Sequence, residues 1–468
     1  MSVFQRPARR TAWARTVLLL PLGLGIALIG ASWWFAAPEP DPPKLPSNSD
    51  APKLAREPDP PKPTRKLDAP ESAPRPDPPK LSYAELTGSL FLPAPKEPVI
   101  TPLVRELPLP PFADATSVWG ATGRDARGHI WVGVSASSNG MSAHLLEYDP
   151  GANTWHDRGA VLDKLKELHL YRQGEGQIKI HSRIVPASDG WLYFASTDEE
   201  GERAESDTPP LWGAHLWRIH PVRYTWEHLA AVREGLVAVS GAARYIYALG
   251  YWGHVLYQYD TATGRTKHVR VGSVEAHVSR NFLTDVHGHA YVPRLRAGPD
   301  GKVSAVLTEY DASLNELGTT PLGFYLHKGS AESNHGIVGV AYLPDGRMLF
   351  ATHIGYLYMI EPRNSGRAAV TAVGWMHPNG EAYTPSLFSL GDHLVAGVAR
   401  NKGSFEWVVA DLSTRVSSVL PLDTRGLQRL LLYGSISRDN AGRFYVGGWA
   451  ARGSDAQRPV VLQIDPMR

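Results

Sequence analysis

The segments IWVG at 130–133 and LLEYD at 145–149 decide the fold, because the chain repeats this pair six more times. The later copies of the first segment are LYFA at 192–195, IYAL at 246–249, AYVP at 290–293, MLFA at 348–351, LVAG at 394–397 and FYVG at 444–447. Those of the second are LWRIH at 216–220, LYQYD at 256–260, LTEYD at 307–311, LYMIE at 357–361, WVVAD at 407–411 and VLQID at 461–465. A period of roughly 45–60 residues built only of short strands and turns predicts an all-β fold, a seven-bladed β-propeller.

Two further features of the repeat concern turns and closure. Most first segments follow an Asp/Gly turn, seen at Asp125–Gly128, Asp189-Gly190, Asp285–Gly288, Asp345-Gly346 and Asp439–Gly442. These aspartates are expected to be turn formers. Only three residues follow VLQID, so the last blade lacks a fourth strand. The segment VRELPL at 104–109 is predicted to supply it and to remove the exposed sheet edge.

Composition excludes several classes of function. The chain has 48 basic and 46 acidic residues, a balance too even for a nucleic-acid footprint. It has no cysteine, which excludes disulfides, thiolate metal sites and a cysteine nucleophile.

The N-terminal region predicts attachment to a membrane. Residues 16–37 carry no charge, and a helix of this length spans a hydrocarbon core of roughly 30 Å. Because four arginines precede it, residues 1–15 are predicted to be a cytoplasmic basic segment, 16–37 a transmembrane signal-anchor helix and the remainder exported to the periplasm or cell exterior. The alternative is a signal peptide cleaved after Ser32.

The next segment, 38–96, predicts a disordered proline-rich stalk. Residues 38–80 hold 15 of the 39 prolines, and Asp-Pro-Pro-Lys occurs at 41–44, 59–62 and 77–80. No apolar periodicity accompanies these prolines, so no packed core is expected. The stalk would lift the propeller, predicted over 97–468, from the membrane; a proline-rich ligand for a partner is the alternative interpretation.

Two sets of blade positions are expected to converge on one end of the central channel. The first set lies about nine residues before the Asp/Gly turns (eleven for His335) and comprises Trp119, His181, Ser279-Arg280, His335, Tyr383 and Tyr433. The second follows the first repeated segment and comprises Tyr251, Arg294, His353, Arg400 and Trp449. A ring of His, Arg, Tyr and Trp around a funnel predicts a ligand site. His144 and His215 recur at equivalent blade positions and are expected to be structural.

One element resembles a known family. The segment KIHSR at 179–183, with Asp189-Gly190 and LYF at 192–194, is similar to an element of seven-bladed propellers of the polysaccharide-lyase type, such as the ulvan and oligogalacturonate lyases. At the level of the blades, 113–468 look similar to streptogramin lyases and to the gluconolactonase group. The resemblance implies proton transfer by histidine and tyrosine and neutralisation of a uronate by arginine or a metal, with His181 as the best single candidate.

The chemistry of β-elimination assigns roles to both sets. It needs a cation on the carboxylate, a base on the adjacent carbon's proton and an acid on the leaving oxygen. The candidate catalytic residues are Arg280 as the cation, His181 or His335 as the base and Tyr251 as the acid. The candidate substrate-binding residues are Arg294, His353, Trp449, Tyr383 and Tyr433, with Arg294 an alternative to Arg280 as the cation. A divalent metal among His181, His335 and His353 is left open, and no cofactor is specified.

The sequence therefore supports two hypotheses. We favour a membrane-anchored, exported propeller that binds a partner protein or envelope glycan at the channel mouth. The alternative is a carbohydrate-active enzyme, a carbon–oxygen lyase acting on polysaccharide through the same residues. Fold does not decide between them.

Overall fold

The computed structural model describes residues 100–466, except 139, 202–207, 243, 252–253, 276, 328–334, 425, 435–436 and 452–455. The predicted basic segment at 1–15, the anchor helix at 16–37 and the stalk at 38–96 lie outside these residues and stay predictions. Within the described part, no helix combines the length and the apolar composition that crossing a membrane requires.

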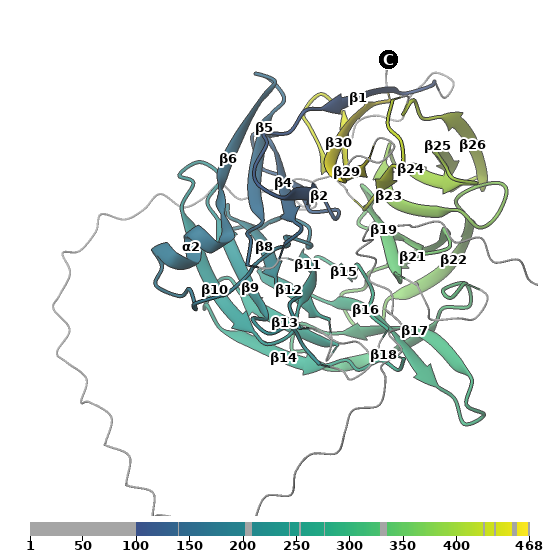
Figure 1. Ribbon diagram of the computed structural model, residues 1–468. Coiled ribbons are helices and arrows are strands. Elements are labelled where there is room, and N and C mark those ends of the chain that lie inside the picture. The colour runs from purple at the N-terminus through teal and green to yellow at the C-terminus, as the bar shows by residue number, and fades with distance from the viewer. Residues whose placement is uncertain are drawn as a thin grey trace, which may run out of the picture. The chain divides into compact units, whose positions relative to one another are not determined.

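Seven antiparallel sheets form the propeller, as the repeat predicts, and are arranged in a ring around a common axis (Figure 1). The strands next to the channel are β2 (Ala115–Ser117) with β3 (Thr122–Arg124), β7 (Val185–Pro186), β11 (Leu236–Ala242), β15 (Leu283–Thr284), β19 (Ile337–Tyr342), β23 (Tyr383–Ser389) and β27 (Leu431–Leu432) with β28 (Ser437–Arg438). The second strands are β4 (Ile130–Ala136), β8 (Leu192–Thr197), β12 (Tyr245–Gly250), β16 (Ala290–Ala297), β20 (Met348–Thr352), β24 (Leu394–Asn401) and β29 (Phe444–Ala450).

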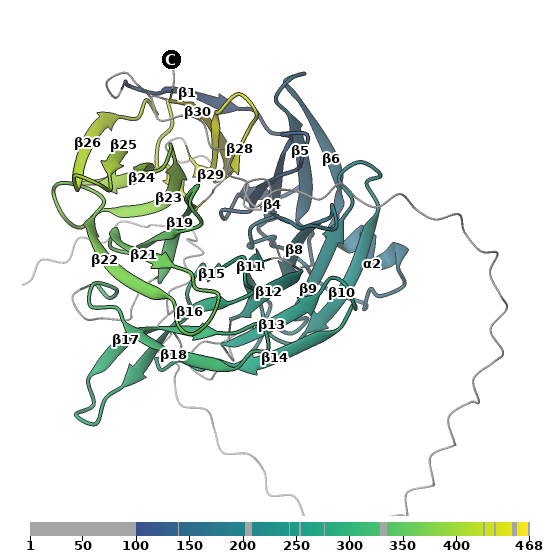
Figure 2. The same cartoon turned by 180° about the vertical axis from the view of Figure 1, so that it is seen from behind.

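The outer half of each blade completes the sheet. The third strands are β5 (His144–Asp149), β9 (Ala214–Ile219), β13 (Val255–Asp260), β17 (Val303–Tyr310), β21 (Tyr356–Glu361), β25 (Ser404–Asp411) and β30 (Arg458–Asp465). The outermost strands are β6 (Thr154–Ala160), β10 (Trp226–Val232), β14 (Thr266–Arg270), β18 (Glu316–Pro321), β22 (Ala369–Trp375), β26 (Val416–Pro421) and β1 (Leu103–Leu107). The same order is seen from behind (Figure 2).

The N-terminal strand β1 closes the ring, as the sequence predicts. It pairs antiparallel with β30 from Leu103 opposite Asp465 to Leu107 opposite Val461. Leu107 is buried and packs in the cluster shared by the seventh and first blades. Strands from opposite ends of the described chain thus share one sheet, which covers the edge of β30.

The hydrophobic core lies between the blades. Seven clusters of buried side chains are present, and each joins two neighbouring sheets around the ring. Trp131, Trp217 and Trp407 are among the largest fully buried side chains. Because every blade buries both of its faces against neighbours, the strands read as continuous apolar runs, which is the repeat seen in the sequence.

The aspartates of the Asp/Gly turns have the predicted structural role. Asp285 accepts backbone hydrogen bonds from His287 and His289, both at 2.9 Å, and one at 2.7 Å from the hydroxyl of Tyr291 on the following strand. The hydroxyl of Tyr445 donates to Asp439 in the same way, at 2.7 Å. The turn therefore ties the inner strand's end to the second strand.

Replacing Asp285 with alanine is expected to lower the free energy of unfolding by about 3 kcal/mol, because two buried donors and one partly buried donor lose their acceptor. Asp345→Ala is the matched control, since Asp345 occupies the same repeat position but is exposed and binds Arg347 alone. We expect that control to cost less than about 1 kcal/mol in urea unfolding. Equal losses for the two variants would contradict this role.

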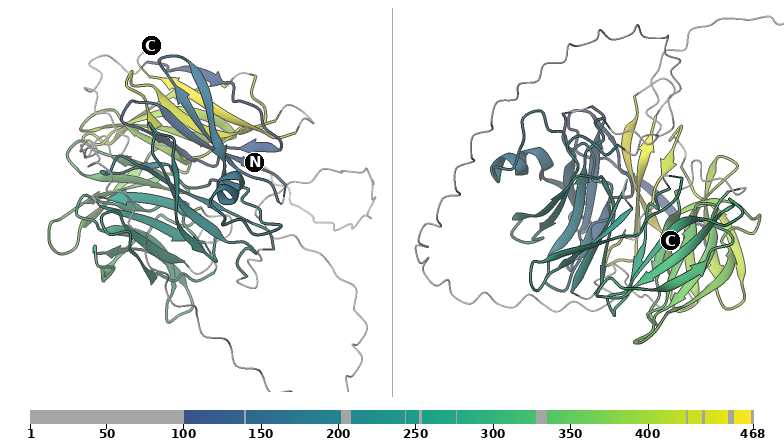
Figure 3. Two further views of the ribbon diagram at one scale, coloured as in Figure 1. Left: turned by 90° about the vertical axis from the view of Figure 1, so that its left-hand side faces the viewer. Right: turned by 90° about the horizontal axis from the view of Figure 1, so that it is seen from below.

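The insertion after β6 contains a short helix, as the helical spacing of Val161, Leu162, Leu165 and Leu168 predicts. Helix α2 (Val161–Glu167) buries Val161, Leu162 and Leu165 in the cluster between the first and second blades, whereas Leu168 at its C-terminal end is exposed. The helix lies at the periphery of the ring beside β6 (Figures 1 and 3). It leads the chain back towards the channel at His181.

Candidate functional site

A small cavity lies at the channel end where the inner strands begin. Its volume is about 20 Å³, room for about one water molecule. Six residues of the first predicted set line it, and they come from six different blades: Trp119, His181, Arg280, His335, Tyr383 and Tyr433. Ser279, the remaining member, is not in the lining. Gly120 and Gly434 complete the wall between the first and seventh blades, where a Cβ on Gly120 would stand 2.3 Å from the carbonyl oxygen of Gly434.

The imidazole of His181 is held between a carbonyl and a guanidinium. Its Nδ1 lies 2.9 Å from the carbonyl oxygen of Val237 and donates to it, which leaves Nε2 as an acceptor for Nη1 of Arg280. Burial, together with the positive charges of Arg280 and Lys179, holds the pKa of His181 well below its ordinary value. His181 is therefore a neutral imidazole whose free lone pair is occupied by Arg280.

His335, His353 and Tyr383 form an adjoining group of rings. The backbone N–H of His335 donates to Nδ1 of His353 at 3.1 Å, and their rings meet edge to face at 4.9 Å. Burial and the charge of Arg280 lower the pKa of His335 to about 2. Burial, followed by the charges of His327 and Arg280, lowers the pKa of His353 to about 4. Burial also raises the pKa of the Tyr383 hydroxyl. All three are uncharged at neutral pH.

The opposite wall is aromatic. The ring centroids of Trp119 and Tyr433 lie 4.7 Å apart, and those of Trp119 and His181 lie 6.3 Å apart in nearly parallel planes. Nζ of Lys179 lies 4.8 Å from the Trp119 ring. Trp449 does not line the cavity but donates from Nε1 to the hydroxyl of Tyr433 at 3.2 Å, so it supports this wall from the seventh blade.

Positive charge in the cavity has no acidic counterpart in the lining. Arg183 is only 7% exposed and its Nη2 donates to the hydroxyl of Ser240 at 3.3 Å. The Nε of Arg183 and the Nε1 of Trp119 are buried and have no acceptor among the residues that the structure describes. Within the described residues, no carboxylate pairs with Arg183 or Arg280. The lining therefore offers hydrogen-bond donors and positive charge, a combination that favours an anion.

None of the five residues of the second predicted set is in the lining of this cavity. Arg294 turns outward along its blade, where Nη2 contacts both carboxylate oxygens of Glu316 at 2.9 Å and Nη1 donates to the carbonyl of Val271. The backbone of Tyr251 bonds to Gly235, and its ring packs against the core between the third and fourth blades. The second strand of each blade is one strand farther from the propeller axis than the innermost strand. A side chain at its end would therefore reach the cavity only by pointing toward the axis.

Sequence reasoning did not select Arg183 and Asn281 as site residues, although both line the cavity. The signal for Arg183 was present, because residues two apart in an extended segment share a face and His181 precedes it by two. Asn281 follows Arg280, and its side-chain amide donates to the carbonyl of Val338 at 3.1 Å.

The histidines expected to be structural have that role. Nδ1 of His144 lies 2.7 Å from a carboxylate oxygen of Asp157. His215 contacts Glu175 through Nε2 at 3.0 Å and His228 through Nδ1 at 2.9 Å. These contacts lie within their own blades, away from the cavity lining.

The geometry gives no support to a metal among His181, His335 and His353. These histidines are not among the groups of converging metal-ligand side chains in the described part of the chain. The guanidinium of Arg280, whose charge lowers the pKa of all three, would also repel a cation. Asp125, His129 and Glu147 do converge on the first blade, but Arg127 pairs with both carboxylates at 2.6 Å, so this group is an ion-pair network.

The strand topology defines the protein as a seven-bladed β-propeller. No protein-family model matches the chain, and no curated protein matches it. Among solved structures, the chain is similar to the extracellular domain of a putative hybrid two-component system from B. thetaiotaomicron, with 14% identity and a TM-score of 0.49 over 78% of this chain and 40% of that chain. The chain thus matches less than half the length of that protein.

Two further solved structures are similar. One is described as YCF48 bound to D1 peptide, with 13% identity and a TM-score of 0.45 over 79% of this chain and 97% of that chain. The other is a complex of KlAtg21 with the coiled coil of AgAtg16, with 11% identity and a TM-score of 0.42 over 74% and 98% of the respective chains. The assignment of the fold rests on the strand topology.

Proposed function

We propose that the protein is a binding module whose channel mouth receives an anionic group, presented by a partner protein or an envelope glycan. The buried guanidinium of Arg183, which has no carboxylate partner among the described residues and an unsatisfied Nε, is the observation that carries the proposal. A buried charge is costly unless it is paired and hydrogen-bonded. A carboxylate inserted between Arg183 and Arg280 would supply both.

The surroundings of this position favour the same class of ligand. The Nε1 of Trp119 offers a further donor, and the neighbouring histidines are neutral and add no negative charge. The volume of about 20 Å³, room for about one water molecule, would admit a terminal carboxylate oxygen of a larger ligand and excludes a whole sugar ring. The body of the ligand would then lie on the blade tops outside the channel.

The same geometry weighs against β-elimination. The lone pair of His181 that would take a proton is engaged by Arg280, and Tyr251, the expected acid, lies outside the cavity. Tyr383 and Tyr433 could replace Tyr251 as acids only for a substrate ring that enters the cavity. Binding without reaction needs none of these rearrangements.

Replacing Arg280 with glutamine in the full-length protein is expected to weaken the binding of succinate and of an oligogalacturonate at least ~30-fold, because a charge-assisted contact is lost. Isothermal titration calorimetry measures this. Arg294→Gln is the control, since that guanidinium pairs with Glu316 away from the cavity.

Two results would contradict the proposal. One is equal affinity of the Arg280→Gln and native proteins for both anions. The other is accumulation of an unsaturated uronate, followed by its ultraviolet absorbance, that is lost in His181→Gln. The second result would establish the lyase activity instead.

A further inference from the structure

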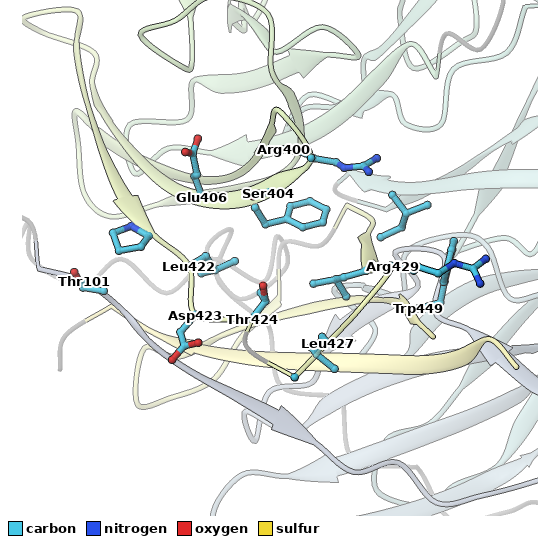
Figure 4. Close-up of a pocket in the computed structure, with 16 residues that line it drawn as sticks. Thr101, Arg400, Ser404, Glu406, Leu422, Asp423, Thr424, Leu427, Arg429 and Trp449 are labelled. Carbon is cyan, nitrogen blue, oxygen red and sulfur yellow. The ribbon is translucent and has the colours of Figure 1, made fainter. Parts of the chain in front are cut away.

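A larger pocket opens between the sixth and seventh blades, with a volume of about 1000 Å³ (Figure 4). The end of β24, the start of β25 and the segment leading into β27 line it, together with Thr101 just before β1. Arg400 and Trp449 of the second predicted set belong to this pocket and not to the channel cavity.

Two residues of the pocket are neighbours of residues that line the channel cavity. Arg400 in the pocket lies directly opposite Tyr383, which lines the cavity, on the paired strands β24 and β23. Trp449 in the pocket donates to the hydroxyl of Tyr433 in the cavity at 3.2 Å. The pocket therefore lies next to the channel cavity, with Tyr383 and Tyr433 between them.

The charges of the pocket are divided between its two sides. Figure 4 shows Arg400, Arg429 and Trp449 toward one side and Glu406 and Asp423 toward the other. Arg400 is exposed. Nδ1 of His377 accepts a hydrogen bond from the backbone N–H of Asn379, so Nε2 of His377 carries the proton and donates to Glu406 at 2.9 Å. The carboxylate of Glu406 is therefore an acceptor in this contact.

The floor between the charged sides is apolar. Phe405, Leu422 and Leu430 form it and are almost fully buried beneath the opening, and Leu427 is partly exposed there. Aliphatic side chains of a ligand that cover this apolar surface would bind favourably, because apolar area is removed from water. The order from the channel outward is therefore positive, apolar and negative.

We propose that the channel mouth and this pocket form one groove for an extended peptide segment of a partner protein. The peptide's carboxylate end enters the cavity at Arg280, its apolar side chains cover the floor at Leu422 and Leu427, and a basic side chain lies between Glu406 and Asp423. This assignment rests on the proposed function, because it takes the channel mouth as the anion site and names the molecule that carries the anion.

The chemistry of the groove favours a peptide over a glycan. An acidic glycan carries repeated negative charges and would be repelled by Glu406 and Asp423 at the outer side. Branched aliphatic side chains do not offer the flat stacking faces that sugar rings use, and Trp449 is the aromatic side chain of the pocket besides the buried Phe405. A peptide supplies negative, apolar and positive groups in one strand.

Fluorescence anisotropy with the full-length protein tests this inference. The probe is a fluorescein-labelled hexapeptide library with an N-terminal lysine, leucine or alanine in the middle and a C-terminal glutamate. In one control library glutamate replaces the lysine, and in the other glutamine amide replaces the C-terminal glutamate. We expect the first library to bind at least ~10-fold tighter than either control, from one charge-assisted contact at each end.

Variants separate the groove from the channel site. Glu406→Gln combined with Asp423→Asn should abolish the preference for lysine while leaving succinate binding, measured by calorimetry, unchanged. Arg280→Gln should weaken both ligands. Asp300→Asn, at an exposed acid in the turn between β16 and β17, is the control for a general loss of negative charge.

The outcomes distinguish the two proposals. If succinate binds but the peptides show no preference for lysine, the groove assignment is overturned and the anion site stands. Tighter binding of an oligogalacturonate than of the peptides, unaffected by the double variant, would overturn the peptide in favour of a glycan. Absence of succinate binding to the native protein would overturn the proposed function and this inference with it.

Discussion

Replacing β1 (Leu103–Leu107) with a Gly-Ser sequence of equal length is expected to lower the free energy of unfolding by on the order of 5 kcal/mol. The variant loses the burial of Leu107, the backbone pairing with β30 and the ion pair between Glu106 and Arg458. A loss of this size approaches the whole stability of many proteins, so the ring should open at moderate urea concentrations.

Urea unfolding followed by tryptophan fluorescence measures the effect, and size-exclusion chromatography reports association through the uncovered edge of β30. Leu103→Asp is the control, because Leu103 is in the same strand but 56% exposed. We expect that control to unfold within about 1 kcal/mol of the native protein. A strand-replaced variant as stable as the native protein would show that β1 does not close the ring.

Acidification is expected to produce the second large loss of stability. Burial lowers the pKa of His335 to about 2, of His277 to about 3, and of His254 and His353 to about 4. In the unfolded chain each of these histidines binds a proton near pH 6.5, whereas in the folded protein it stays neutral. Because the unfolded state then binds more protons, the free energy of unfolding is highest above pH 6.5 and decreases as the pH falls below it. At pH 5 each histidine costs about 2 kcal/mol, and the four together cost on the order of 8 kcal/mol.

The free energy of unfolding measured in urea from pH 8 to pH 4.5 checks this expectation. His254→Gln isolates one histidine, because the glutamine amide keeps a donor for the carbonyl of Pro293 but binds no proton. Below pH 6 the variant's pH slope should be smaller by about 1.4 kcal/mol per pH unit. A native protein whose stability is constant from pH 7 to pH 5 would contradict the neutral state of these buried rings.

The residues that could be assigned from the sequence are those fixed by repetition. The strand cores recur because every blade buries both faces, and the turn aspartates recur because each binds the backbone of its own turn, as Asp285 does. The closing strand could be predicted because the last repeat lacked a partner for its outer edge. The first set of site positions could be placed because the start of an inner strand always faces the channel.

Positions at the ends of the second strands could not be assigned in this way. The alternation of a strand gives the face of a residue, but at a strand end the side chain's direction depends on the neighbour that it meets. Arg294 points outward and binds Glu316, whereas Arg400 contacts no carboxylate among the described residues and lines the pocket. The charges that decide these directions lie on other strands of the blade.

The sequence by itself determined the number of blades, their turns and the strand that closes the ring, because these features depend on contacts that each repeat makes in the same way. Only the tertiary structure decided that Arg183 is buried beside Arg280 without a carboxylate and that the sixth and seventh blades enclose a pocket beside the channel. Those features arise where side chains from different blades meet, and the free energy of a buried charge depends on all of its neighbours at once.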